Sequence, residues 1–399
     1  MSMPDARMMA REGSVFFTLA FRPFFIAASL WSAIALAIWI GMLMGSIALP
    51  SRFDPLAWHI HEMLFGFVPA AIAGFMLTAI HNWTGRAPVH GVLLGSLAAL
   101  WLLGRVACLV SAFMPLWVAA AADLAFPVTL CAVAAREIIA SRNWRNLAVP
   151  VPVAVLSVAN LLMYLELAGL DMPSGLGWRL GLAAIIILIS VIGGRIIPAF
   201  TRNWLASRRA RTLPAVHRWL DRVASGLLHA GLLGWAFFPV SRVCGVLLLV
   251  AAVLNFRRLA LWCGYAVRTE PLLASLHLGY LWMITGVALL GANQLNGAIP
   301  LAGAIHALTA GAIGTMVLAV MTRVSLGHTG RPLQADGVTT WIYGTVGVAA
   351  LTRVVAAFCG APAYMLLLDL SAVLWTVSFL LFAVHYAPTL VSRASGPKG

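Results

Sequence analysis

The amino-acid sequence predicts an all-α integral membrane protein of about twelve transmembrane helices. Of its 399 residues, 62% are hydrophobic and only 10% are charged, and the mean hydropathy is +0.96, a composition that soluble domains do not have. Twelve separate apolar segments are long enough to cross the ~30 Å hydrocarbon core of a bilayer. Similar residues also recur along the chain at a nearly constant offset, which predicts three repeated four-helix units.

The predicted spans are separated by turn residues or by charges. They cover approximately residues 16–44, 56–80, 90–112, 116–140, 148–169, 176–199, 220–239, 242–264, 272–291, 300–325, 338–359 and 363–386. The first is too long for the apolar region of a signal peptide, so we interpret it as an uncleaved span. We expect one transmembrane domain, residues 1–399, whose internal units cover approximately residues 14–142, 146–266 and 270–388.

The charge distribution predicts the orientation of the chain. Most cations follow the even-numbered spans, at Arg86, Arg142, Arg145, Arg202, Arg208, Arg209, Arg211, Arg218, Arg257, Arg258, Arg268, Arg331, Arg393 and Lys398. By the positive-inside rule these loops, and both termini, face the cytoplasm. The formal net charge of +14 is therefore a topology signal, and we expect no nucleic-acid partner.

The repeat is clearest between the first and the last predicted unit. His61 precedes Thr84-Gly85-Arg86 by 23 residues, and His306 precedes Thr329-Gly330-Arg331 by the same number. Further matches at offsets of 245 to 248 are Gly66 with Gly311, Arg105 with Arg353, and Asp123 with Asp369. A weaker middle copy is indicated by Asn82-Trp83 and Asn203-Trp204.

Two of these matches predict ion pairs inside the membrane. Arg105 and Asp123 flank one predicted outer loop, and Arg353 and Asp369 flank another. Antiparallel neighbouring helices would bring each pair to one depth, where an unpaired charge costs several kcal/mol. We therefore expect a salt bridge in each unit, with a proton relay as the alternative.

The candidate site is the stretch from Trp58 to Gly66, Trp-His-Ile-His-Glu-Met-Leu-Phe-Gly. An ionisable residue within a span is a functional candidate by default. Asp54 and Pro55 predict that the helix begins before the histidines, so His59 and His61 point about 200° apart and should not bind one metal ion together.

His61 is the stronger candidate, because His306 is its counterpart at the same depth of the repeat. Two such imidazoles could be axial ligands of a haem iron or could bind copper. Glu62 could carry protons, orient a ligating imidazole or bond a neighbouring backbone group. His277 and His328 could form a second metal site near the inner face, although buried histidines are more often satisfied by carbonyl groups. The five cysteines lie in apolar segments and form no C-x-x-C motif, so no disulfide framework or covalent c-type haem site is expected.

The sequence resembles the NnrS family over essentially its whole length. The resemblance lies in the Trp58–Gly66 stretch, in Asn82-Trp83-Thr84-Gly85-Arg86, in His306 with Gly327-His328-Thr329-Gly330-Arg331-Pro332, and in Phe21-Arg22-Pro23-Phe24-Phe25. It implies a bacterial inner-membrane protein with haem, of the b type, and copper, associated with nitric-oxide metabolism and protection against nitrosative stress. Three four-helix units are also similar in architecture to the haem–copper oxidases.

Together these observations lead to two hypotheses. In the first, the protein binds or reduces nitric oxide near the outer face, and Glu62 passes protons. The candidate cofactor-binding residues are Trp58, His59, His61 and His306. The candidate metal ligands are His59, His61, His306, His277 and His328. Its partners would be the lipid bilayer, nitric oxide and an unknown electron donor, for which a quinol is one candidate. In the second, the same histidines serve a transporter or a metal-handling permease; a sensor without turnover is a third interpretation.

Overall fold

All regular structure in the described part of the chain is helical. The computed structural model describes residues 15–144, 146 and 150–392, and no strand occurs among them. Three of the cations used to predict the orientation, Arg145, Arg393 and Lys398, lie outside these residues. The all-α prediction is therefore confirmed for the described residues.

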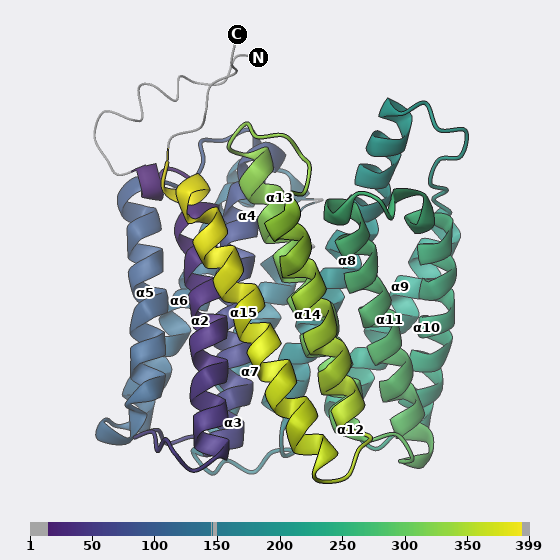
Figure 1. Cartoon of the computed structure of the whole chain (residues 1–399). Helices are drawn as coiled ribbons and strands as arrows, with labels where there is room; N and C mark the ends of the chain where they lie inside the picture. The colour runs from purple at the N-terminus through teal and green to yellow at the C-terminus, as the bar shows by residue number, and fades with distance from the viewer. Residues whose placement is uncertain (1–14, 145, 147–149, 393–399) are drawn as a thin grey trace. The chain divides into compact units, whose positions relative to one another are not determined.

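The helices follow one another with short connections (Figure 1). They are α2 (Phe21–Leu43), α3 (Pro55–His61), the π-helix η2 (Glu62–Phe67), α4 (Val68–Thr84), α5 (Gly91–Leu109), α6 (Leu116–Ala140), α7 (Pro150–Leu167), α8 (Leu176–Ser207), α9 (Arg218–Phe237), α10 (Arg242–Leu261), α11 (Pro271–Asn296), α12 (Leu301–His306), the π-helix η6 (Ala307–Gly314), α13 (Thr315–Gly327), α14 (Gly337–Ala356) and α15 (Ala363–Val391). Three short 3₁₀ turns, η1 (Val15–Phe17), η3 (Ser111–Phe113) and η5 (Gly264–Val267), complete the described elements.

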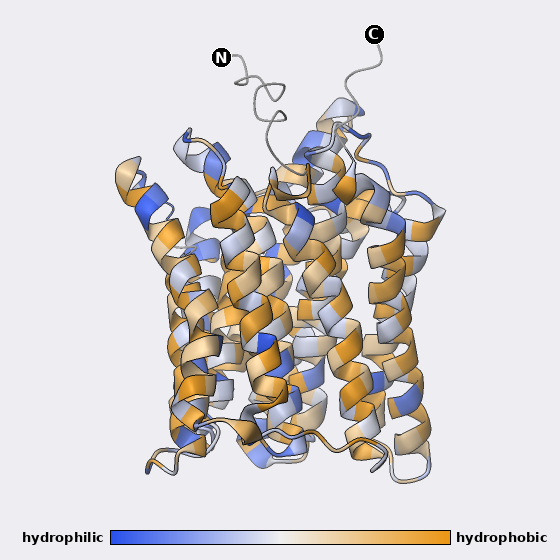
Figure 2. Ribbon diagram, turned by 90° about the vertical axis from the view of Figure 1, so that its left-hand side faces the viewer, coloured by the Kyte–Doolittle hydropathy of each residue, from blue (hydrophilic) through white to orange (hydrophobic). Residues whose placement is uncertain are grey.

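Eleven helical segments of the described chain are long and apolar enough to cross a membrane, and apolar residues predominate along them (Figure 2). The protein is therefore a multi-pass membrane protein.

The seventh of the twelve predicted spans, α9, is not among the eleven segments that are long and apolar enough to cross a membrane. Asp221, Arg222 and His229 lie within it and lower its hydropathy. The helix of the sixth predicted span, α8, continues to Ser207, beyond the apolar run.

The chain divides into two compact units. Unit 1 contains the described residues up to 170, together with 321–333 and 382–392, and unit 2 contains 171–320 and 334–381. The division into three units stays a prediction.

In unit 1 the Phe21-Arg22-Pro23-Phe24-Phe25 motif forms the first turn of α2. Phe24 and Phe25 are completely buried, and α4 approaches them at Gly74, where a Cβ atom would lie 2.5 Å from the Phe25 ring. The buried Arg22 guanidinium donates from Nη1 to the carbonyl groups of Leu390 and Ser392, both at 2.7 Å. It thereby satisfies carbonyls at the end of α15 that have no partner within the helix.

The two spans that carry the repeat histidines share an unusual backbone feature. The π-helix η2 begins immediately after His61, and the π-helix η6 begins immediately after His306. A π-helix holds an extra residue in its turn, is rare, and frequently lies at a functional site. The same irregularity thus occurs at the same offset of 245 residues as the sequence repeat.

Candidate functional site

The candidate site is built around the start of α3 in unit 1. Asp54 caps the helix by accepting hydrogen bonds from the backbone N–H groups of Leu56 and Ala57, at 2.9 and 3.0 Å. Pro55 occupies the first helical position, where its missing N–H has no cost. The predicted start of the helix before the two histidines is confirmed, so both imidazoles project from regular helix.

His59 and His61 point to different surroundings, as helix geometry predicts. The His59 ring stacks on Trp39, with 4.8 Å between the ring centroids. The His61 side chain is completely buried and stacks on Phe53, also at 4.8 Å. The two imidazoles therefore do not share one ligand position.

Oxygen acceptors face both ring nitrogens of His61. Its Nδ1 atom lies 3.1 Å from Oε1 of Glu62. Its Nε2 atom lies 2.8 Å from Oδ1 of Asn160 and 3.1 Å from Oδ2 of Asp123. Because carboxylate oxygens only accept hydrogen bonds, both ring nitrogens can donate here, and a metal ion bound at Nδ1 would take the place of the proton on that nitrogen.

Arg105 on α5 joins the two carboxylates of the site. Its Nη1 atom donates to Oε2 of Glu62 at 2.6 Å, and its Nη2 atom forms an ion pair with Asp123 on α6. The indole of Trp31 on α2 also donates to Oε2 of Glu62, at 2.8 Å. The predicted Arg105–Asp123 ion pair is confirmed, and Glu62 is fixed at both oxygens.

The C-terminal part of α7 completes the cluster. Asn160 donates to Oδ2 of Asp123 at 2.7 Å, which orients its own amide oxygen toward His61. The hydroxyl of Tyr164 lies 3.1 Å from Sγ of Cys108 on α5 and 3.3 Å from Oδ2 of Asp123. Five membrane helices thus contribute one connected polar network, which we call the His61 cluster: Trp31, His61, Glu62, Arg105, Cys108, Asp123, Asn160 and Tyr164.

The electrostatics of the His61 cluster depend on its burial. His61 and Glu62 are completely buried, and Arg105 and Asp123 are 2% and 1% exposed. One guanidinium and two carboxylates carry a formal charge of −1, and a cationic imidazole brings the sum to zero. Charges so far from water persist only when they are paired and hydrogen-bonded. The cluster meets both conditions at every charged group except Nε of Arg105, which has no hydrogen-bond partner among the described residues.

The chemistry and spacing of the donor atoms fit a metal ion. His61, Glu62 and Cys108 each offer one ligand atom, and all three atoms lie within 4.8 Å of one another. Nδ1 of His61 lies 3.9 Å from Sγ of Cys108 and 3.1 Å from Oε1 of Glu62. Tetrahedral coordination at ordinary bond lengths would require separations of about 3.4–3.6 Å. The Nε2 atom faces Asp123, the kind of outer partner that orients ligating imidazoles.

The same surroundings do not fit a haem on His61. Phe53 covers one face of the ring, and the rings of Phe65 and Tyr164 lie 5.4 and 5.6 Å away. A porphyrin bound through Nε2 would have to displace Asn160 and Asp123. We therefore derive no chemistry from a haem at this histidine. The predicted haem shared by His61 and His306 is therefore not proposed below, where haem is kept only at His306.

In unit 2, His306 has the hydrogen bond expected of a ligating histidine. Its Nδ1 atom lies 2.8 Å from the carbonyl oxygen of Ala302, one turn earlier. Because a carbonyl can only accept, Nδ1 carries the proton, and in the neutral ring the lone pair is on Nε2. This tautomer fits an imidazole ligand of copper or haem iron.

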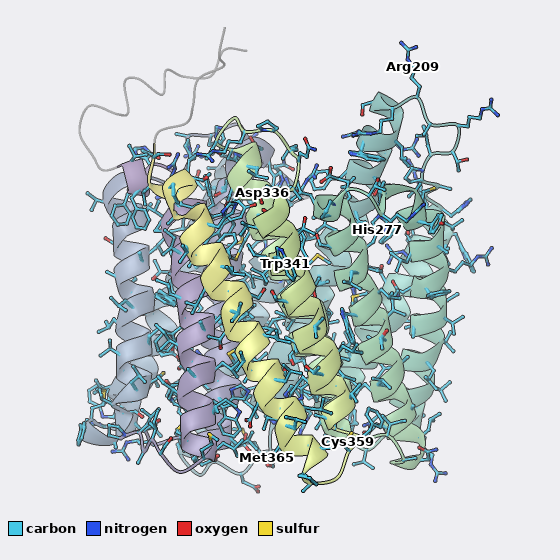
Figure 3. The ribbon with its side chains drawn as sticks, in the orientation of Figure 1. Arg209, His277, Asp336, Trp341, Cys359 and Met365 are labelled. Carbon is cyan, nitrogen blue, oxygen red and sulfur yellow. The ribbon has the colours of Figure 1, made fainter. Side chains whose placement is uncertain are left out.

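The proposed inner metal site is not assembled within either unit. His277, labelled on α11 in Figure 3, is buried in unit 2, and its Nε2 atom lies 2.9 Å from the hydroxyl of Thr201. His328 follows α13 in unit 1, where its ring packs against Phe21. Partial burial and the nearby His81 lower the pKa of His328. A metal held jointly by His277 and His328 stays a prediction.

The second predicted ion pair was wrong. Arg353 and Asp369 form no ion pair among the described residues; the Arg353 guanidinium lies 5.9 Å from the centre of the Tyr364 ring. The last unit therefore does not reproduce the electrostatics of the first, although its charged residues lie at equivalent sequence positions.

Trp58 is the remaining residue that the sequence predicts at the cofactor. Its side chain is completely buried, and it contributes no metal-ligand atom to the His61 cluster.

Sequence reasoning missed four members of the His61 cluster, namely Trp31, Cys108, Asn160 and Tyr164. Cys108 follows Arg105 by three residues, and Tyr164 follows Asn160 by four, so each pair lies on one helical face. These spacings could have indicated two polar faces within apolar spans. Which helices face one another, however, is decided only by packing.

The fold and the site define a multi-pass membrane protein with a buried, charge-paired cluster of potential metal ligands. The family model described as NnrS protein matches residues 15–393. The chain belongs to this family, and membership supports a role in the response to nitric oxide. No curated protein matches the chain.

Proposed function

We propose that this chain is an inner-membrane metalloprotein that binds or reduces nitric oxide and protects the cell against nitrosative stress. In this proposal both termini face the cytoplasm, and an electron donor such as a quinol supplies reducing equivalents. The observation that carries the proposal is the His61 cluster, in which an imidazole, a carboxylate and a thiol converge in a membrane protein of the nitric-oxide response.

His61, Glu62 and Cys108 would hold the metal ion. The combination of thiolate and imidazole favours copper or zinc over hard cations; copper, when bound, would supply an open coordination position and a redox couple for nitric oxide. Arg105 and Trp31 hold Glu62 by its other oxygen, and Asp123 and Asn160 hold the His61 ring. Glu62 would also pass protons, since its Oε1 atom lies 3.1 Å from Nδ1 of His61.

Haem remains part of the proposal through His306. Its Nδ1–H group is bonded to the Ala302 carbonyl, so that the lone pair of the neutral ring is on Nε2. A transporter or metal-handling permease is the competing function. A bundle that moves ions needs mobile ligands, whereas the His61 ring is held at Nε2 by Asn160 and Asp123 and is stacked on Phe53.

Purified protein provides the test. We expect bound copper, a Soret band, and a spectral change or gas consumption when the reduced protein meets nitric oxide. Cys108→Ser should lose the copper and keep the Soret band. Cys131→Ser is the matched control, because Cys131 lies on α6 of the same unit and outside the cluster, with its sulfur 3.9 Å from the Ser157 hydroxyl.

The outcomes separate the functions. Folded protein that contains neither transition metal nor haem after expression with both supplied would refute the metalloprotein. Metal-loaded protein that ignores nitric oxide but moves metal ions across vesicle membranes would establish the permease instead.

A further inference from the structure

One end of unit 2 carries a dense set of exposed cations. This end is formed by the connection between α8 and α9, by the connection between α10 and α11, and by the helix ends that they join. A hydrogen bond from the backbone N–H group of Ala215 to the carbonyl of Leu261, at 3.0 Å, holds the two connections together. We call their exposed arginines the basic surface: Arg202, Arg208, Arg209, Arg211, Arg218, Arg222, Arg257 and Arg268.

No exposed carboxylate balances these charges. Between residues 172 and 270 the only acidic residues are Asp221 and Glu270. Asp221 accepts a hydrogen bond from Nε of the buried Arg258, at 2.7 Å. Glu270 is 7% exposed and caps α11 by accepting from the backbone N–H group of Leu272, at 3.3 Å. None of the arginines of the basic surface forms an ion pair in the described part of the chain, so their charges are open to an anionic partner.

The connection between α8 and α9 presents its cations away from the bundle. The end of α8 extends beyond the neighbouring helices of unit 2 (Figure 1), with Arg209 at its tip in Figure 3. Arg202 donates from Nη2 to the carbonyl of Pro214, which fixes the connection against α8. Arg209 has a φ of 53°, a left-handed conformation that glycine adopts at lower cost after a helix end. An arginine at this position indicates a use for its guanidinium.

Exposed aromatic side chains accompany the arginines. Trp219, in the first turn of α9, is 68% exposed, and Tyr265, in η5, is 78% exposed. The Arg268 guanidinium lies 4.1 Å from the centre of the Tyr265 ring. Tryptophan and tyrosine are enriched where membrane helices meet the headgroups, and arginine clusters next to a span bind anionic lipids. Because these rings lie at the ends of membrane helices, they favour a lipid headgroup over an acidic protein as the partner.

We propose that the basic surface binds the phosphate groups of anionic phospholipids, such as phosphatidylglycerol. The guanidinium groups donate charge-assisted hydrogen bonds to phosphate oxygens. Trp219 and Tyr265 pack against the glycerol and the upper acyl carbons of the same lipids. This binding holds the connection between α8 and α9 at the membrane surface. It concerns a lipid and no residue of the His61 cluster, so it goes beyond the proposed function.

Native mass spectrometry of the purified full-length protein in detergent tests the proposal. Phosphatidylglycerol is compared with phosphatidylcholine, which has the same phosphate but no net charge, and the wild type should bind the first more tightly. From the contribution of each basic residue near an anionic surface, Arg209→Gln should weaken this binding about fivefold. The combination of Arg209→Gln, Arg211→Gln and Arg218→Gln should weaken it about 100-fold. These three side chains form no hydrogen bond or ion pair among the described residues, so the variants should fold.

Arg242→Gln is the matched control, because Arg242 is an exposed arginine at the opposite end of α10 in the same unit. It should bind phosphatidylglycerol as the wild type does. Higher salt should weaken the wild-type binding, since it screens exposed charges. Equal binding of the two lipids by the wild type would overturn the proposal, and so would wild-type affinity in the triple variant. Binding of neither lipid would also overturn it and would favour an acidic protein as the partner.

Discussion

At the scale of single residues, Arg105 determines whether the carboxylates of the His61 cluster can stay ionised in the membrane. It bonds Glu62 and Asp123 at once and is almost completely buried. No other guanidinium forms an ion pair with either carboxylate in the described chain. Both carboxylates consequently depend on this one guanidinium as their arginine partner.

Replacing Arg105 with leucine should destabilise the protein by about 3–5 kcal/mol, because two buried carboxylates lose their partner. Denaturant unfolding in detergent micelles measures the loss. Arg353→Leu is the control, since Arg353 occupies the equivalent repeat position without an ion pair, and its effect should be much smaller. Equal losses for the two variants would contradict the assignment.

Asn160 is expected to act on the metal through His61. The Asn160→Leu substitution removes one acceptor from Nε2 and one donor to Asp123. Loss of such an outer hydrogen bond commonly weakens metal binding by about 10- to 100-fold. Competition with a copper chelator measures the affinity. Asn255→Leu, a substitution of a buried asparagine in unit 2, should leave it unchanged; an unaffected Asn160→Leu would remove Asn160 from the site.

At the scale of elements, the π-helix η2 brings α2 and α5 into contact with the site at Gly66. A Cβ atom there would lie 2.6 Å from Nη1 of Arg105, 2.8 Å from Oε2 of Glu62 and 2.8 Å from the Trp31 nitrogen. Trp101 on α5 also donates to the Gly66 carbonyl at 2.9 Å. The glycine is therefore required by the close approach of three polar groups.

Gly66→Ala should push these groups apart and cost about 1–3 kcal/mol, the usual penalty for overpacking a core, together with a loss of copper. Gly95→Ala on α5 is the control, because nothing lies within 4 Å of an added Cβ atom there. Midpoints of thermal unfolding and metal analysis compare the two variants. Normal copper content in Gly66→Ala would show that the contact is not needed for metal binding.

At the scale of the whole molecule, the distribution of arginines predicts which side of the membrane each loop faces. The connection between α8 and α9 carries Arg208, Arg209 and Arg211, and Arg209 projects from the end of α8 in Figure 3. The connection between α7 and α8 carries Asp171 and no arginine. The positive-inside rule places the first in the cytoplasm and the second outside.

Single cysteines introduced into a cysteine-free variant test this orientation. A membrane-impermeant maleimide added to spheroplasts should label Ser174→Cys and leave Arg209→Cys unlabelled until the membrane is broken. The reverse pattern would invert the chain and place the His61 cluster nearer the cytoplasm.

The sequence alone determined the class of the protein, because runs of apolar residues require helices that satisfy their own backbone in lipid. It also indicated the helix start at Asp54, the divergence of His59 and His61, and the Arg105–Asp123 pair, all of which follow from local periodicity and from the high cost of an unpaired charge. Only the tertiary structure decided that Cys108, Asn160 and Tyr164 meet His61. Those contacts depend on which faces of five helices pack together, and apolar spans of similar composition do not encode that choice in any local pattern. The same limit explains the error at Arg353, where an equivalent sequence position does not guarantee an equivalent partner.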